Sequence, residues 1–139
     1  MSKIAVVFWS GTGNTEAMAQ AVADGASAKN AEVDIVQASD FGADGVAGYD
    51  AIAFGCPAMG DEELEGDEFQ PMWDDVKPEL SGKTIALFGS YDWGTGEWMD
   101  TWKDDAEEAG ASIAGTVIAN NEPDDEAISA CNDLGASLA

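Results

Sequence analysis

Three short runs of the chain are almost continuously apolar, at residues 4–8, 51–55 and 84–89. Strands with apolar side chains on both faces are typical of a parallel sheet that is covered on both sides. Residues 32–35 instead alternate polar and apolar side chains, which indicates a more exposed strand at the edge of the sheet. Residues 113–119 supply a fifth strand, so the pattern predicts five strands.

Helical spacing is clearest at two places. Between residues 17 and 25, small and apolar side chains recur on one helical face and predict a helix of about four turns, with Thr12 or Asn14 as its N-cap. A closing helix is predicted from Asp124 to Leu138, capped by Asp124 or Asp125. Both helices follow strands, as crossover helices do.

A helix is also predicted from Glu97 to Ala109, and its apolar residues lie on one face. Trp98 and Trp102 belong to that face, so we expect both indoles in the core. Gly110 is placed to end the helix, because glycine readily adopts the left-handed backbone of a helix C-terminus.

A further helix between Phe69 and Leu80 must be short or broken. Pro71 suits the first turn of a helix, whereas Pro78 would stop it. The alternation of strands and helices over short links predicts an α/β domain, doubly wound, with a parallel sheet and helices on both faces. At 139 residues, we expect a single domain over residues 1–139.

The charge of the chain is ordinary in amount and unusual in sign. There are 28 acidic residues and 5 basic ones, all lysine, for a net charge of −23. Nucleic acid and anionic membrane surfaces are excluded as partners, because both need clustered basic residues. The start of the chain enters an apolar strand pattern without a signal peptide, and no apolar run is long enough to cross a bilayer, so we expect a cytoplasmic protein.

The sequence offers little chemistry of its own. It has no histidine, and its two cysteines, Cys56 and Cys131, lie far apart without a CxxC motif. These facts exclude Cys/His zinc sites, histidine acid–base catalysis and a disulfide framework. We therefore expect no catalytic residues and no metal, and any reactivity must come from a cofactor.

The segment after the first strand is a candidate anion site, because ligands of α/β sheets bind beyond the carboxyl ends of the strands. Residues 9–15 are small, hydroxylated or glycine and lead into a helix N-terminus, where N–H groups favour an anion. The segment is not a Walker loop, which needs a Gly-Lys-Ser/Thr ending, and it is not a dinucleotide fingerprint, because Glu16 stands in place of the third glycine. A capped, glycine-rich turn is the alternative.

The segments after the third and fourth strands suit an aromatic ring. Met59 and Gly60, followed by carboxylates, can hold a flat heteroaromatic against sulfur, although the alternative is a solvated acidic loop. Three glycines surround Trp93, so its indole is expected to be exposed or stacked on a ligand. Together the three loops predict a site for an aromatic phosphomonoester.

At these loops the sequence resembles the flavodoxins, specifically their short-chain group. The residues that carry the resemblance are 10–15, 57–62 and 89–94. It implies a flavodoxin-like five-stranded parallel sheet of order 2-1-3-4-5 and non-covalently bound FMN at the switch point between the first and third strands, as is typical of that fold. The implied function is a low-potential one-electron carrier, with no substrate of its own, that shuttles electrons between redox enzymes.

The resemblance also implies a role for individual residues. Ser10, Thr12, Thr15 and Asn14 would hold the phosphate, with Met59 on the inner ring face and Trp93 on the outer face. Glu62 would accept from flavin N3–H, and rotation of the Gly60 peptide toward N5 would favour the neutral semiquinone. The implied cofactor-binding set is Trp9, Ser10, Gly11, Thr12, Gly13, Asn14, Thr15, Pro57, Ala58, Met59, Gly60, Asp61, Glu62, Ser90, Tyr91, Asp92, Trp93, Gly94 and Asn120.

One position departs from the family pattern. Asp92 stands where the short-chain group commonly carries glycine, close to flavin N1 and O2. We expect this carboxylate to make full reduction of the cofactor harder. Replacement of Asp92 by glycine would then raise the second reduction potential.

The alternative function is an FMN-dependent NAD(P)H:quinone oxidoreductase on the same fold. Trp93 would block much of the ring face that such an enzyme needs.

The acidity of the chain has two explanations. One is transient docking of a monomer to redox partners with basic faces. The other is a host that keeps high internal salt.

The charge itself generates a prediction. A net charge of −23 destabilises the folded state by self-repulsion, which salt screens. We expect the midpoint of thermal unfolding to rise by roughly 5 °C between dilute buffer and molar KCl. Equal midpoints would contradict the high-salt explanation and leave docking as the reason for the acidity.

Overall fold

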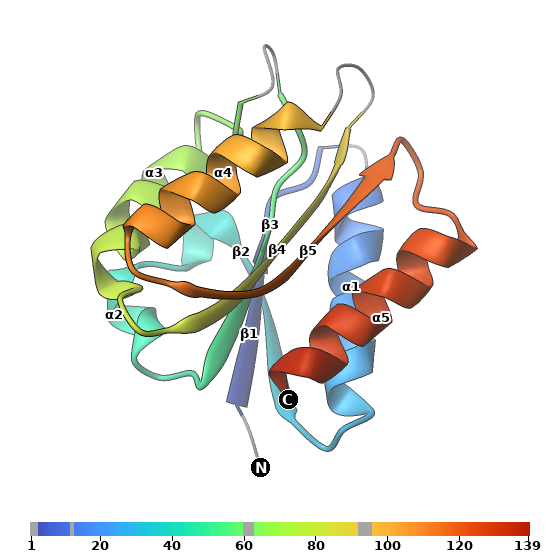
Figure 1. Cartoon of the computed structure of the whole chain (residues 1–139), viewed down its shortest axis with the longest axis horizontal. Helices are drawn as coiled ribbons and strands as arrows, with labels where there is room; N and C mark the ends of the chain where they lie inside the picture. The colour runs from blue at the N-terminus through green and yellow to red at the C-terminus, as the bar shows by residue number, and fades with distance from the viewer. Residues whose placement is uncertain (1–2, 12, 60–62, 92–95) are drawn as a thin grey trace.

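A computed structural model describes residues 3–11, 13–59, 63–91 and 96–139, and at its centre is a five-stranded parallel sheet (Figure 1). The strand order is β2-β1-β3-β4-β5, as the resemblance implied. The strands are β1 (Lys3–Phe8), β2 (Glu32–Gln37), β3 (Ala51–Gly55), β4 (Thr84–Tyr91) and β5 (Ser112–Asn120).

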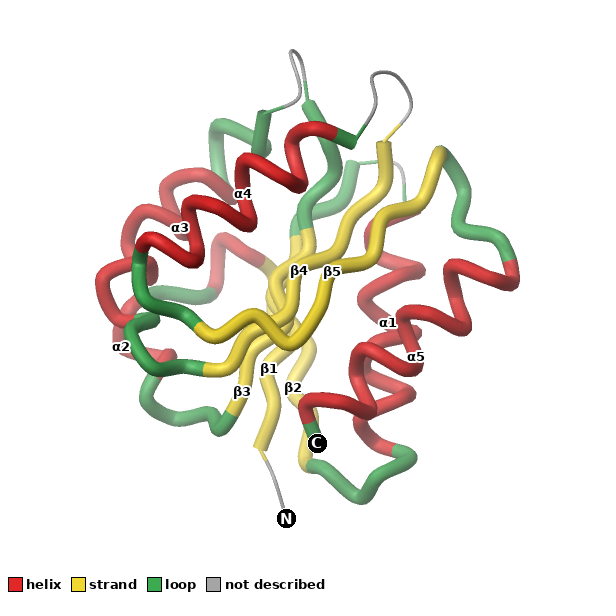
Figure 2. The backbone as a smooth tube through the Cα atoms, in the orientation of Figure 1, coloured by secondary structure: helices red, strands yellow, loops and turns green. Residues whose placement is uncertain are grey.

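The helices cover both faces of the sheet, which confirms the expected architecture (Figure 2). The bounds are α1 (Asn14–Ser27), α2 (Ala43–Val46), α3 (Phe69–Val76), α4 (Glu97–Glu108) and α5 (Asp125–Leu138), with short 3-10 turns η1 (Ala38–Asp40) and η2 (Lys77–Glu79). Helices α1 and α5 lie on one face, and α3 and α4 lie on the other. None of the helices in these described ranges is long and apolar enough to cross a membrane.

The core has two halves because successive side chains of a strand point to opposite faces. In β1, Ile4, Val6 and Phe8 pack with α1 and α5. Ala5 and Val7 pack with the cluster under α3 and α4. The central strand β3 is buried at all five positions, whereas β2 is largely exposed, as its alternating pattern predicted.

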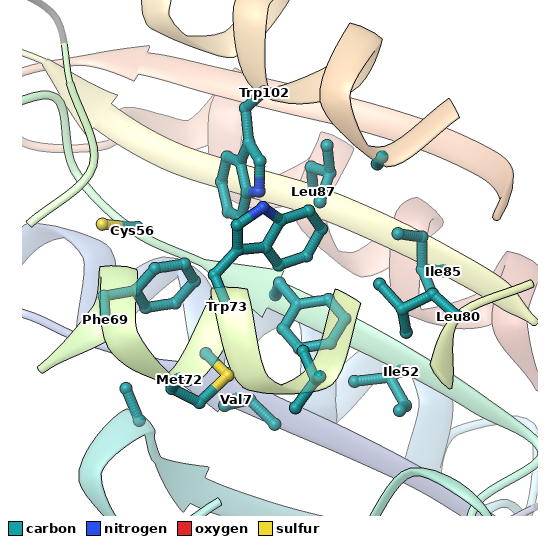
Figure 3. Packing of buried hydrophobic residues seen from close by; sticks show 14 of the residues in the cluster. Val7, Ile52, Cys56, Phe69, Met72, Trp73, Leu80, Ile85, Leu87 and Trp102 are labelled. Atoms are coloured by element: carbon teal, nitrogen blue, oxygen red, sulfur yellow. The ribbon is translucent and has the colours of Figure 1, made fainter. Parts of the chain in front are cut away.

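Aromatic side chains fill the half of the core under α3 and α4 (Figure 3). Trp73 packs edge-on against Trp102 with ring centroids 5.6 Å apart, and Phe69 packs edge-on against Trp102 at 5.4 Å. Trp98 and Trp102 are each 2% exposed, so the prediction that both belong to the core is confirmed. Aromatic pairs with this geometry contribute beyond the area that they bury.

The helix ends follow the sequence signals with one exception. Asp124 caps α5, its side chain accepting the Ala127 N–H at 2.8 Å, and Gly110 follows α4 with a φ of +92°. The cap predicted for α1 was wrong at Asn14, which is the first helical residue. Gly13 is the N-cap instead, because its φ of +93° lets the chain turn sharply into the helix.

Two elements between β2 and β3, α2 and η1, were absent from the predicted order. Helix α2 has only four residues, too few to show helical periodicity in the sequence. The break after α3 does agree with the prediction: Pro71 lies in the first turn, and Pro78 lies in η2, where the helix has ended.

Helices α1 and α5 approach each other backbone to backbone. A Cβ atom added to Gly135 would lie 1.9 Å from the Val22 carbonyl oxygen, and one added to Gly25 would lie 1.9 Å from the Asn132 carbonyl oxygen. Only glycine leaves room for this contact. The two helices consequently form one tight layer over β1 and β4.

The turn into α3 is organised by a buried carboxylate. Glu65 is 6% exposed, and its carboxylate accepts the backbone N–H groups of Asp67, Glu68 and Phe69 at 2.8–2.9 Å. Burial alone would raise the pKa of Glu65, but these three N–H groups hold it below its usual value. The ionised carboxylate therefore satisfies the first turn of the helix in place of an N-cap side chain.

The glycine contact predicts a large penalty for a small change. Gly135→Ala would drive a methyl group into the backbone of α1, so we expect the free energy of unfolding to fall by about 2–3 kcal/mol. Chemical denaturation measures this change. Gly66→Ala is the control, because a Cβ atom added there would meet no other atom within 4 Å, and its free energy should change by less than about 0.5 kcal/mol.

The Glu65 cap predicts a pH-dependent stability difference. A carboxyl with a lowered folded pKa stabilises the fold above its unfolded pKa, about 4.3, and this contribution is lost as pH falls through the folded pKa. Glu65→Gln should cost about 2 kcal/mol at pH 7. The gap to wild type should close on acidification. The exposed residue Glu68 gives the control, Glu68→Gln, which should be neutral; a gap that persists in acid would contradict the assignment.

Candidate functional site

The carboxyl ends of β1, β3 and β4 meet at one edge of the sheet, where the predicted loops follow them (Figure 1). Main-chain hydrogen bonds continue the strand pairing into these loops. Trp9 N–H donates to the Gly55 carbonyl at 3.0 Å, and Ala58 N–H donates to the Ser90 carbonyl at 3.0 Å. The three loops are therefore tied to one another at their bases.

A cavity of about 200 Å³ lies at this edge. It is lined by Trp9, Gly11, Asn14, Pro57, Ala58, Met59, Ser90, Tyr91 and Asn121. Eight of these nine residues belong to the predicted site, drawn from all three loops. Seven predicted residues lie outside the described part of the chain: Thr12, Gly60, Asp61, Glu62, Asp92, Trp93 and Gly94.

The loop between β1 and α1 has the form of an anion cradle. Ser10 Oγ accepts the Gly13 N–H at 3.1 Å, which folds the loop back on itself. Gly13 has no side chain to cap the helix, and a Cβ placed there would meet no atom within 4 Å. The first N–H groups of a helix have no acceptor within it, so this helix end can receive an anion.

Two predicted hydroxyls, on Thr15 and Ser90, meet behind this cradle. Thr15 Oγ1 and Ser90 Oγ lie 3.2 Å apart, and the two residues are 1% and 5% exposed. This hydrogen bond ties the first turn of α1 to the end of β4. It also explains how two polar residues lie buried at the sheet edge without an unsatisfied hydroxyl.

Two described residues of the loop after β3 pair with each other. Met59 and Glu63 form an antiparallel bridge, with N–H to carbonyl distances of 2.8 and 2.9 Å in the two directions. The Met59 side chain is 39% exposed although it is large and apolar. An exposed thioether beside a cavity suits a flat aromatic ligand, because sulfur packs well on aromatic rings.

The segment after β5 contributes a residue that the sequence reasoning did not single out. Asn121 lines the cavity, and its N–H donates to the Tyr91 carbonyl at 2.6 Å. Asn120, the predicted residue, is exposed at the end of β5 and accepts from the Asn121 side chain at 3.1 Å. Asn121 has a φ of +58°, a left-handed conformation that asparagine tolerates better than most residues. No sequence pattern distinguished Asn121 from Asn120.

Cys56 lies beside the cavity but is fully buried. Burial raises the pKa of its thiol strongly, so the reactive thiolate is not formed at neutral pH. This environment suits a cysteine that packs in the core and does not react.

A larger groove, about 690 Å³, lies between α4 and residues 63–70. It shares no lining residue with the cavity at the strand ends. Its lining includes the carboxylates of Glu63, Asp104 and Glu108, so it does not suit a phosphate. The smaller cavity remains the candidate site because the anion cradle and the ring-binding loop meet there.

The residues of this cavity fit FMN in their chemistry. The cradle supplies hydroxyls, an amide and backbone N–H groups, which bind a phosphate without a basic side chain. Apolar surface from Trp9, Met59 and Tyr91 lies beside it. A polar anion site joined to an apolar slot matches a molecule with a phosphate at one end and an aromatic ring at the other.

Comparison with known proteins agrees with this geometry. The family described as "Flavodoxin" matches residues 6–133. The chain is 48% identical to a flavodoxin of Megasphaera elsdenii, covering 98% of each, and 42% identical to a flavodoxin of Clostridium beijerinckii, covering 96% and 97%. The solution structure of the two-electron reduced M. elsdenii protein superimposes with a TM-score of 0.91 at 47% identity, covering 97% of each chain.

These relatives carry electrons and are not enzymes, so the oxidoreductase alternative is not favoured. The family that the three loops resemble, the observed fold and the cofactor of the family are consistent with one another. The chain belongs to the flavodoxin family, whose members are electron-transfer proteins that bind FMN.

Proposed function

We propose that the cavity at the carboxyl ends of β1, β3 and β4 is the FMN site of this electron carrier. The observation that carries the proposal is the cradle at the start of α1, where Gly13 leaves the helix end open to an anion. Ser10, Thr12, Asn14 and Thr15 hold the phosphate together with the loop N–H groups. When bound, FMN supplies the one-electron redox chemistry that the side chains lack.

The ring-binding residues come from the other two loops. Met59 covers the inner face of the flavin, and Trp93 covers the outer face. Glu62 accepts a hydrogen bond from flavin N3–H, and the Gly60 peptide offers its carbonyl toward N5. The cavity walls include Pro57, Ala58, Ser90, Tyr91 and Asn121. The proposed set adds Asp61, Asp92 and Gly94, together with Asn120, which accepts a hydrogen bond from the Asn121 side chain.

The acidity of the chain lowers the reduction potential in this proposal. An uncompensated carboxylate about 12 Å from the flavin, at an effective dielectric of about 40, disfavours an added negative charge by roughly 0.7 kcal/mol. For a one-electron step this is about 30 mV. Three or four such carboxylates lower the potential by roughly 100 mV.

The distribution of charge supports docking to basic partners. Four of the five lysines lie at the amino end of the sheet, away from the cavity: Lys3, Lys29, Lys77 and Lys83. Two of them are engaged there, Lys77 with Asp105 at 3.1 Å and Lys83 with the Tyr49 carbonyl at 2.7 Å. The cavity end is left acidic, which steers a basic partner toward the flavin.

The proposal includes a monomer of one domain that works in the cytoplasm. A net charge of −23 opposes association of two copies. Both cysteines are buried and unpaired, as is usual for proteins of reducing compartments.

The proposed phosphate contacts predict a difference between two ligands. Asn14→Ala should weaken FMN binding roughly tenfold, which is about 1.4 kcal/mol. Riboflavin lacks the phosphate, so its affinity should change by less than about twofold. Titration of the apoprotein, followed by quenching of flavin fluorescence, measures both affinities.

The control for this experiment is Gln20→Ala. It removes an exposed amide from the same helix, where Gln20 donates to Asp24 at 3.0 Å. Both ligands should bind this variant as they bind wild type. An equal loss of FMN and riboflavin affinity in Asn14→Ala would contradict the phosphate contact, and wild-type protein that binds neither ligand would contradict the site.

A further inference from the structure

Cys56 is a meeting point of hydrogen bonds between the loops of the proposed site. Its N–H donates to the Phe88 carbonyl of β4 at 3.1 Å. Its Sγ accepts the Glu65 N–H at 3.3 Å, and its thiol donates to the Pro57 carbonyl at 3.5 Å. One buried residue thus joins two strands to the turn that leads into α3.

A fourth hydrogen bond reaches Cys56 from a different part of the chain. The indole Nε1–H of Trp98, in the first turn of α4, donates to the Cys56 carbonyl at 3.3 Å. Cys56 immediately precedes the loop that carries Met59. Trp98 closely follows the loop after β4, and its ring packs on Tyr91 of the cavity wall, with centroids 5.6 Å apart.

The close packing around this bond depends on glycine. A Cβ atom at Gly89 would lie 2.1 Å from the Cys56 carbonyl oxygen and 3.1 Å from Trp98 Cζ2. Any larger residue at position 89 would push the carbonyl and the indole apart. Glycine at position 89 therefore leaves room for this contact, in which the indole N–H of Trp98 satisfies the buried Cys56 carbonyl.

We propose that Trp98 is a positioning residue for the cofactor: its hydrogen bond to Cys56 holds the start of the loop after β3 at a fixed distance from the first turn of α4. The proposal rests on the FMN site described above, in which the flavin binds between the loops that follow β3 and β4. A fixed separation prepares the slot before the ring enters it, so less ordering is needed on binding. It also limits the entry of water.

The chain offers a matched control for this bond in Trp102. Trp102 lies one turn later on the same helix and is also 2% exposed. Its Nε1, unlike that of Trp98, has no hydrogen-bond partner among the described residues. Replacement of either indole by phenylalanine removes similar volume, but only Trp98→Phe removes a hydrogen bond.

The experiment compares Trp98→Phe with Trp102→Phe in three measurements: thermal unfolding of the apoprotein, FMN affinity, and the two reduction potentials of the flavin-loaded protein. We expect both variants to lose thermal stability. Only Trp98→Phe should bind FMN more weakly, by roughly fivefold, which is about 1 kcal/mol.

The reduction potentials separate positioning from general packing. A looser slot admits water, which stabilises the negative charge of fully reduced FMN more than the neutral oxidised form. Trp98→Phe should therefore favour the reduced form by roughly threefold, a rise of about 28 mV for a one-electron step. Trp102→Phe should leave both potentials where they are in wild type.

A second pair keeps the test open if a tryptophan variant does not fold. Cys56→Ala keeps the carbonyl that accepts from Trp98 but removes the sulfur that accepts the Glu65 N–H and helps to fix Cys56 in place. Cys131→Ala removes the other fully buried cysteine, which belongs to α5 and does not line the cavity. Each leaves a cavity of one sulfur atom. FMN affinity should fall only in Cys56→Ala.

Each outcome decides the matter. Unchanged FMN affinity and potentials in Trp98→Phe would overturn the proposal, as would equal changes in Trp98→Phe and Trp102→Phe. For the second pair, equal effects of the two cysteine variants would do the same. Wild-type protein that does not bind FMN would overturn the site itself, and this failure is visible before any variant is made.

Discussion

Every feature of this molecule depends on the need to bury a parallel sheet on both faces. The strands β1, β3 and β4 carry apolar side chains on each side, so helices must cover both. Each crossover returns the chain to the amino end of the sheet, and all carboxyl ends consequently open on the same edge. The loops at that edge are the place where polar groups can gather without disturbing the core.

The site follows from this arrangement in a chain with few cations. A phosphate in a protein with a net charge of −23 has to be bound by groups that carry no full charge. In the proposed site, backbone N–H groups and hydroxyls at the start of α1 serve this purpose, and a lysine there is not needed. Four of the five lysines lie at the other end of the sheet, so the acidic surface and the proposed anion cradle coexist in this chain.

Much of this could be predicted from the sequence. Five strands, their parallel arrangement and the burial of Trp98 and Trp102 followed from periodicity, because the apolar positions are spaced by the structure that buries them. The exposed edge strand β2 was visible in its alternation. Residues of the three loops line one cavity, and these loops were selected because glycine and hydroxyl residues cluster after the strands.

Other features depend on three-dimensional contacts that no local pattern records. The four residues of α2 are too few to show a period, and the cap of α1 is a glycine with a positive φ where a side chain was expected. Asn121 lies at the cavity because its backbone N–H donates a hydrogen bond to the Tyr91 carbonyl. The bond from Trp98 to Cys56 joins residues 42 positions apart, and the spacing of apolar residues cannot reveal it.

The contact between α1 and α5 has a consequence for how the protein is made. Gly25 and Gly135 interlock helices from the two ends of the chain. During synthesis, α1 emerges from the ribosome early and has no partner for that surface until α5 has followed it. The proposed cradle for the cofactor is the N-terminus of the same α1. Its final packing, and with it the capture of a flavin, therefore waits until α5 has been translated.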